Sequence, residues 1–148
     1  MTRLYLCGPM TGLPEYNFPA FDAAADQLRE AGHEVFSPAE NDREDGFDAT
    51  GLQGHEAAEH GFDLRTALKQ DLSWICDHAE GIALLYGWED SKGARAEVAL
   101  GKALGIQSWV YPLWLKPEQR VFATGGRIKP ETVSFKLGQG IVIEPVSV

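Results

Sequence analysis

Two acidic residues, Glu97 and Asp71, lie in segments where helical spacing predicts mostly small or apolar neighbours. A carboxylate in such surroundings is costly to bury unless it is hydrogen-bonded or takes part in chemistry. The alternative for Glu97 is a solvent-exposed glutamate, and the spacing does not decide between the two. The alternative for Asp71 is an ordinary polar position on an amphipathic helix. The small and apolar neighbours of Glu97 are Ala94, Ala96, Val98, Ala99 and Leu100.

A second candidate site is the segment Gly8-Pro9-Met10-Thr11-Gly12, which follows an apolar run. Its two glycines would let the backbone approach a ligand closely, and Thr11 adds a hydroxyl group. Ser91 and Gly93 lie where a helix is predicted to begin, and free N–H groups there favour an anion such as phosphate. The spacing alone favours the simpler interpretation, a tight turn and an ordinary helix cap. The sequence contains neither GxGxxG nor GxxxxGK[ST].

Other chemistry-bearing residues form weaker patterns. His55 and His60 are five positions apart, so they do not form the HExxH zinc motif, and a solvated acidic loop is favoured over a metal site. No GxSxG motif is present. Cys7 and Cys76 each lie in an apolar stretch and are predicted to be buried, reduced thiols, which is typical of a cytoplasmic protein.

These residues are positioned by alternating strands and helices. Apolar runs predict strands at 3–7, 34–37, 81–86 and 107–111. Helices are predicted from Asn17, a candidate cap followed by Pro19, to Gly32, over 65–77, and up to Leu104 from a cap at either Asp90 or Ser91. The predicted fold is α/β, a flavodoxin- or Rossmann-like three-layer domain with a central parallel sheet. Ligands bind at the carboxyl ends of strands in such sheets, so the loops that follow them should converge.

Two segments of the chain show no clear period. Residues 38–63 are predicted to form a long acidic loop, with one possible helical turn within 54–60. Residues 112–148 are predicted to form a less regular, β-containing C-terminal extension, either an added strand pair or an arm that packs on a partner subunit. With 148 residues, the whole chain 1–148 is expected to be one domain.

The charge is strongly acidic, with 13 Lys and Arg against 22 Asp and Glu and a net charge of −9. This composition argues against binding to DNA or RNA strands, where positive charge supplies most of the affinity. The acidic 38–63 segment would repel a polyanion and also disfavours a doubly charged phosphate. No apolar run approaches the length of a membrane span, so a soluble protein without membrane contact is expected. The acidic residues of this segment are Glu40, Asp42, Glu44, Asp45, Asp48, Glu56, Glu59 and Asp63.

Three stretches in order carry a resemblance to the nucleoside 2-deoxyribosyltransferase-like superfamily. Tyr5-Leu6-Cys7-Gly8 is similar to the opening strand of the 2′-deoxynucleoside 5′-monophosphate N-glycosidases, which ends in Tyr-Phe-Cys-Gly. Gln70-Asp71-Leu72-Ser73-Trp74 resembles their Gln-Asp-Leu-x-Trp helix. Ser91-x-Gly93-x-x-x-Glu97 keeps the spacing of their Ser-x-Gly-x-x-x-Glu segment. The opening Tyr-Leu-Cys-Gly-Pro-Met-Thr-Gly also resembles an uncharacterised family common in phages and prophages.

This resemblance implies cleavage of the N-glycosidic bond of a (deoxy)nucleoside or its 5′-monophosphate, by hydrolysis or by transfer to a second base. Glu97 would be the nucleophile, Asp71 the acid/base, and Tyr5 would position Glu97 through its hydroxyl group. Gly8, Thr11, Gly12 and Ser91 would hold a 5′-phosphate. No cofactor and no metal are implied.

The resemblance leaves two further expectations. Relatives complete each site with a second subunit, and Trp109, Trp114 and Phe122 suggest apolar surface for a homodimer or larger homo-oligomer. The alternative function is a non-catalytic module of the same fold that binds a nucleotide or an ADP-ribose-type ligand.

Overall fold

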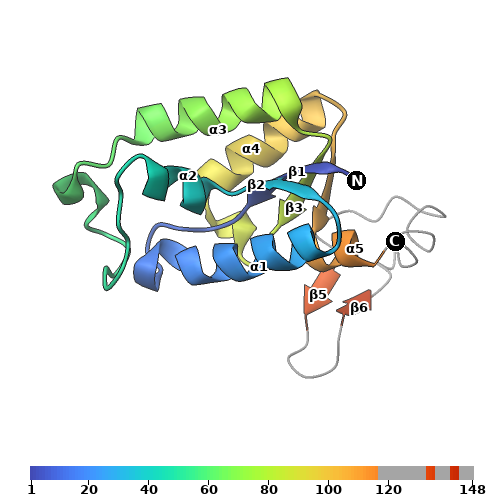
Figure 1. Ribbon diagram of the computed structural model, residues 1–148, viewed down its shortest axis with the longest axis horizontal. Helices are drawn as coiled ribbons and strands as arrows, with labels where there is room; N and C mark the ends of the chain where they lie inside the picture. The colour runs from blue at the N-terminus through green and yellow to red at the C-terminus, as the bar shows by residue number, and fades with distance from the viewer. Residues whose placement is uncertain (117–132, 136–140, 144–148) are drawn as a thin grey trace.

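The computed structural model describes residues 1–116, 133–135 and 141–143. Its centre is a sheet of four parallel strands in the order β2-β1-β3-β4 (Figure 1). The register places Tyr5 of β1 beside Phe36 of β2 and Ile82 of β3. These strands are β1 (Arg3–Cys7), β2 (Glu34–Phe36), β3 (Gly81–Leu84) and β4 (Gln107–Val110). The predicted α/β fold with a central parallel sheet is confirmed.

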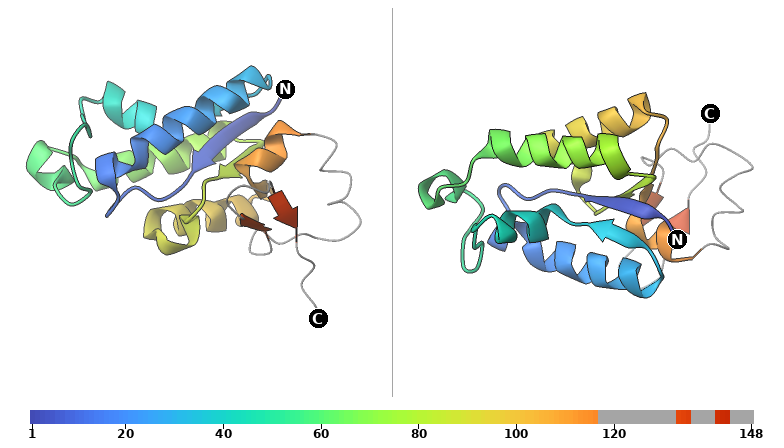
Figure 2. Two further views of the ribbon diagram at one scale, coloured as in Figure 1. Left: turned by 90° about the horizontal axis from the view of Figure 1, so that it is seen from below. Right: turned by 45° about the horizontal axis from the view of Figure 1, so that its top comes forward.

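Helices cover both faces of the sheet. The helices α1 (Phe18–Glu30) and α5 (Tyr111–Leu115) lie on one face, and α3 (Leu64–His78) and α4 (Lys92–Ala103) lie on the other (Figures 1 and 2). A short helix, α2 (Pro38–Glu44), packs against both α1 and α3. Three 3₁₀ turns complete the connections: η1 (Pro14–Asn17), η2 (Ala57–His60) and η3 (Trp88–Asp90). None of the helices in the described part of the chain is long and apolar enough to cross a membrane.

The alternation of side chains along β1 divides the core in two. Leu4 and Leu6 pack with α1, whereas Tyr5 and Cys7 pack toward the face that α3 and α4 cover. Successive residues of a strand point to opposite faces, so this division follows from the strand itself. It directs the only hydroxyl group of β1 toward α4.

The acidic segment 38–63 is more regular than predicted. Instead of one long loop, it begins with α2 and contains η2. The turn η2 confirms the helical turn predicted within 54–60, whereas α2 was not predicted. Helix α2 buries Pro38, Ala39 and Asp42, a face too short and too polar to show a period in the sequence. The prediction of an irregular loop is therefore wrong for the first seven residues.

Three residue-level predictions are also wrong. Cys76, predicted to be buried, is exposed, because the buried face of α3 consists of Ala67, Asp71 and Ile75. Asn17 does not cap α1 with its side chain; its Nδ2 donates to the carbonyl oxygen of Pro9 at 3.0 Å. Trp114 is not surface: it is 4% exposed, and its Nε1 donates to the Ile82 carbonyl oxygen.

The C-terminal extension contains a strand pair, as one of the two alternatives predicted. The strands β5 (Val133–Phe135) and β6 (Ile141–Ile143) are antiparallel, with Ser134 opposite Val142. Phe122, which was assigned to an oligomer surface, lies outside the described residues. The homo-oligomer itself stays a prediction.

Candidate functional site

The side chains of Tyr5 and Glu97 meet beneath the sheet, although they are 92 positions apart. The Tyr5 hydroxyl donates to Glu97 Oε1 at 3.0 Å. Tyr5 is fully buried and Glu97 is 6% exposed. Tyr5 lies on strand β1 and Glu97 lies on helix α4. Ser91 caps the start of this helix, because its Oγ atom accepts from the Ala94 N–H group. The alternative of a solvent-exposed Glu97 is therefore excluded.

Asp71 lies beside this pair. It is 6% exposed on the buried face of α3, so it does not belong to the exposed face of that helix. Its Oδ1 atom is buried and has no hydrogen-bond partner among the described residues. A buried carboxylate with an unsatisfied oxygen is costly, whereas a protonated carboxyl is much less so. The position therefore favours a carboxyl group that carries a proton.

Burial raises the pKa of both carboxyl groups. For Asp71, removal from water raises the pKa to about 7, the charge of Glu97 adds to this effect, and hydrogen bonding to Tyr5 opposes it. For Glu97, removal from water also raises the pKa to about 7, while hydrogen bonds from Cys7 and Tyr5 oppose the rise. Two carboxyl groups that interact in this way titrate as a pair and hold about one proton near neutral pH.

Cys7 is a third buried group in this cluster. Its Sγ atom lies 3.5 Å from the carbonyl oxygen of Ala94, to which the thiol can donate. Burial and the nearby charge of Glu97 raise the pKa of the thiol well above its usual value. The thiol therefore stays protonated and serves as a weak donor rather than as a nucleophile.

Asp42 is a further member of the site that the sequence did not single out. It is 5% exposed on α2, and burial raises its pKa to about 7, with the charges of Asp71 and Asp45 adding to the rise. Its charge also raises the pKa of Glu97. Asp42 was only one of eight acids in a segment read as a loop, so its burial left no signal in the sequence.

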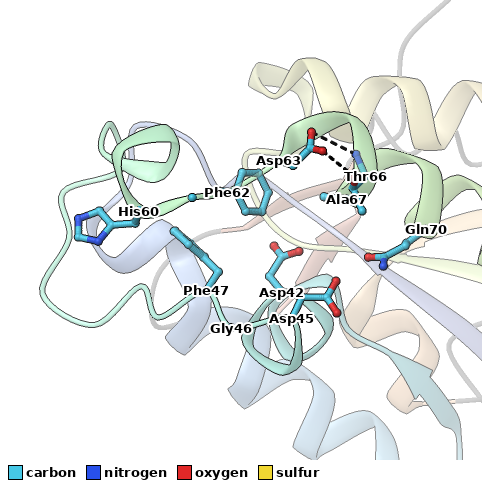
Figure 3. Close-up of a pocket in the computed structure, with 11 residues that line it drawn as sticks. Asp42, Asp45, Gly46, Phe47, His60, Phe62, Asp63, Thr66, Ala67 and Gln70 are labelled. Atoms are coloured by element: carbon cyan, nitrogen blue, oxygen red, sulfur yellow. Dashed lines mark hydrogen bonds between the residues drawn. The ribbon is translucent and has the colours of Figure 1, made fainter.

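A cavity of about 350 Å³ opens beside Asp42 (Figure 3). The residues around it come from the end of α2, from the segment 60–63 and from the first half of α3. They are Asp42, Asp45, Gly46, Phe47, His60, Gly61, Phe62, Asp63, Thr66, Ala67 and Gln70. The acidic segment therefore lines the cavity directly, and Asp42, whose charge also affects Glu97, is one of its lining residues.

The 8–12 segment lies at the carboxyl end of β1 but does not line this cavity. A Cβ atom on Gly8 would lie 2.7 Å from the Leu85 side chain, so close packing of β1 on the loop after β3 requires glycine there. The Gly12 N–H donates to the Gly54 carbonyl oxygen at 2.9 Å. The Met10 carbonyl oxygen accepts from the Leu13 N–H. Thr11 is exposed. Most of these groups already serve internal contacts.

The loops that follow the first three strands do converge. Gly12 bonds to Gly54, as above, and a Cβ atom on Gly87 would lie 3.4 Å from the Pro9 ring. Strands β1 and β3 are neighbours whose connections leave in opposite directions, which is the usual ligand position in such sheets. Ser91 caps α4 through the bond to Ala94, and Gly93 faces Leu68 of α3. The predicted convergence of the loops is confirmed.

No group of three or more His, Cys, Asp or Glu side chains in the described part of the chain could hold a metal ion.

No curated protein matches the chain. The model of one family, described as a domain of unknown function (DUF4406), matches residues 2–110. The match spans β1 to β4 and includes Tyr5, Asp42, Asp71 and Glu97. Because it covers most of the sequence, the chain belongs to the DUF4406 family.

Proposed function

We propose that this protein cleaves the N-glycosidic bond of a (deoxy)nucleoside or its 5′-monophosphate, as an N-glycosidase or a deoxyribosyltransferase. The observation that carries the proposal is the buried hydrogen bond from the Tyr5 hydroxyl to Glu97 at 3.0 Å, with Asp71 beside it. A carboxylate held in a fixed position, next to a carboxyl group that keeps a proton, is what displacement of a nucleobase from a sugar requires.

In the proposed first step, a Glu97 oxygen forms a bond to the anomeric carbon as the bond from that carbon to the base nitrogen breaks. The proton of Asp71 passes to the departing base, which leaves neutral. In the second step, water or another base attacks the anomeric carbon, Asp71 takes up the proton of the attacking group, and Glu97 is released as a carboxylate. Tyr5 is a positioning residue that holds the attacking oxygen.

The proton balance of the site supports these roles. Removal from water raises the pKa of both Asp71 and Glu97, and hydrogen bonding to Tyr5 opposes the rise at both groups. The Tyr5 hydroxyl lies 3.0 Å from Glu97 Oε1 and donates to it, which favours the ionised form of Glu97. Asp71 Oδ1 has no partner among the described residues, which favours the protonated form there. The shared proton thus belongs on Asp71, the group that must donate it.

The surroundings favour a substrate without a 5′-phosphate. The Gly12 N–H is already bonded to the Gly54 carbonyl oxygen, so it does not serve a phosphate. The neighbouring cavity carries Asp42, Asp45 and Asp63, which repel a dianion.

One observation favours a binding module as the second candidate. Glu97 and Asp71 are each 6% exposed, so a ligand could occupy the cavity beside Asp42 without reaching them. A nucleotide-sensing protein would then bind its ligand and leave it intact.

Release of free base from a panel of nucleosides and deoxynucleosides, with and without a 5′-phosphate, tests the proposal. The wild-type protein should release base from at least one of them, and Glu97→Gln should reduce the rate by about 1,000-fold or more, since it removes the nucleophile. Glu30→Gln, an exposed change on α1, serves as the control and should leave the rate unchanged. Stabilisation by a ligand that stays intact, with no release from the whole panel, would favour the binding module.

A further inference from the structure

The cavity beside Asp42 has two kinds of wall. Phe47 and Phe62 form an apolar side, with ring centroids 5.1 Å apart and ring planes inclined by 54°. Asp42 and Gln70 form a polar side, from α2 and α3 respectively (Figure 3). At about 350 Å³, the cavity is within the size range of small-molecule sites. Apolar rings beside a few polar groups are typical of sites that bind a flat, heteroaromatic group.

The charge of the cavity restricts what can enter. Asp42, Asp45 and Asp63 contribute carboxyl groups, and none of the 11 lining residues is Lys or Arg. A phosphate group would meet like charge with no counter-charge along this wall. An uncharged ring that presents hydrogen-bond donors to a carboxylate would instead be favoured.

The polar side presents an acceptor and a donor next to each other. The Asp42 carboxyl group points into the cavity (Figure 3). The amide of Gln70 is held by Asn41, whose Nδ2 donates to Gln70 Oε1 at 2.7 Å. Because Asn41 takes the oxygen, the Nε2 hydrogens of Gln70 are the part of the amide available to a ligand.

Asp42 also connects the cavity with the reaction centre. Its charge interacts with Asp71, its neighbour in the site, and with Glu97. Gln70 of the cavity wall directly precedes Asp71 on α3, so the cavity and the Asp71 carboxyl group adjoin the same turn of this helix. A nucleoside with its base in the cavity would therefore have its glycosidic nitrogen on the side of Asp71.

We propose that this cavity is the nucleobase subsite, in which Asp42 accepts a hydrogen bond from an exocyclic amino group and Gln70 donates to the adjacent ring nitrogen. This inference rests on the proposed function and names its substrate class: nucleosides of adenine and cytosine. In hypoxanthine and uracil, a carbonyl oxygen replaces the amino group and faces Asp42, while a ring N–H faces the Gln70 donor. When Asp42 is ionised, both contacts then become unfavourable.

Binding of matched nucleosides to the Glu97→Gln protein tests the inference, since this variant should not turn them over. Titration calorimetry should give an affinity about tenfold or more higher for deoxyadenosine than for deoxyinosine, and likewise for deoxycytidine over deoxyuridine. Adding Asp42→Asn should bring each ratio close to one, because an amide can turn either its oxygen or its NH₂ group toward the ligand. Adding Glu44→Gln, an equal charge change on the exposed face of α2, should keep the ratios.

The outcomes separate this inference from the function on which it rests. Equal affinities within both pairs, no binding of any nucleoside, or ratios that survive Asp42→Asn would overturn the subsite even if the wild-type protein releases base. Selective binding that Asp42→Asn abolishes supports the subsite. If the wild-type protein then releases no base, the subsite stands and the proposed reaction fails.

Discussion

Exposed acids of the chain accept hydrogen bonds from nearby backbone N–H groups, whereas the buried acids of the site have few such partners. Asp63 caps α3 by accepting from the Arg65 and Thr66 N–H groups, and Glu56 accepts from the Gln53 and His55 N–H groups. These hydrogen bonds lower the pKa of both acids. Such carboxylates are charged, solvated and structural.

Asp42, Asp71 and Glu97 differ in each of these respects. Burial raises the pKa of each to about 7, and the charges of neighbouring acids add to the rise. Residues of the same type therefore serve opposite purposes within about 60 positions of sequence. Solvent exposure and hydrogen-bond partners, rather than residue type, therefore distinguish an acid that stabilises a loop from one that can transfer a proton.

Among these predictions, Asp71→Asn should cause the largest loss of activity. The variant keeps the shape of the side chain but has no proton to give to the departing base, so release of base should fall by about 100- to 10,000-fold. Steady-state rates on the best nucleoside of the panel measure this effect. Asp77→Asn, an exposed acid on the same helix, is the matched control and should keep the wild-type rate. Equal rates for Asp71→Asn and the control would remove Asp71 from the mechanism.

The stability of the protein should depend on pH in opposite directions for the buried acids and for the exposed acids. The buried acids bind a proton more tightly in the folded state than in the unfolded state, so their contribution to stability is present at low pH. It is lost as pH rises from about 4 toward about 7. The exposed acids with lowered pKa contribute above pH 4, and that contribution is lost as pH falls further.

Chemical denaturation across this pH range measures the difference. The free energy of unfolding should fall by on the order of 1–3 kcal/mol between pH 5 and 8. Glu97→Gln should reduce this fall, since it removes one of the titrating groups. A wild-type stability that rises over the same range would contradict the raised pKa values.

Asp63→Ala should give the smallest effect, and it tests the structural role of an exposed acid. It removes the side chain that accepts from the Arg65 and Thr66 N–H groups at the start of α3, so the midpoint of thermal unfolding should fall slightly. Asp77→Ala, near the other end of α3, removes an equal charge where a helix end disfavours an acid. That control should leave the midpoint unchanged or slightly raised, and an equal fall in both variants would argue against a capping role.

The sequence predicted those parts of the fold whose signals are local. The apolar run of β1 was placed correctly, and of the two predicted candidates for the cap of α4, Asp90 and Ser91, the structure uses Ser91. Burial and capping each depend on neighbouring residues. Helix α3 was placed within one residue at each end. Its buried residues were harder to predict. Cys76 was expected to be buried, whereas the small Ala67 and the charged Asp71 do not resemble core residues in a sequence.

The missed features depend on contacts between distant segments. The sequence gives no sign that α2 packs against α3, so it could not show that Asp42 is buried while Glu44 of the same helix is exposed. Asn17 resembles an ordinary helix cap, but its side chain holds the Pro9 carbonyl oxygen of a neighbouring loop instead. Trp114 resembles an exposed aromatic residue, but Gly81 has no side chain and so leaves room for its ring.

By itself, the sequence determined the order of the four sheet strands and of α1, α3 and α4, because these follow from local pattern and spacing. Only the tertiary structure decided that Tyr5 donates to Glu97, that Asp71 lacks a partner for one oxygen among the described residues, and that Asp42 faces a cavity. The physical reason is that exclusion of water sets the properties of a carboxyl group. Water is excluded here by residues brought together from β1, α2, α3 and α4.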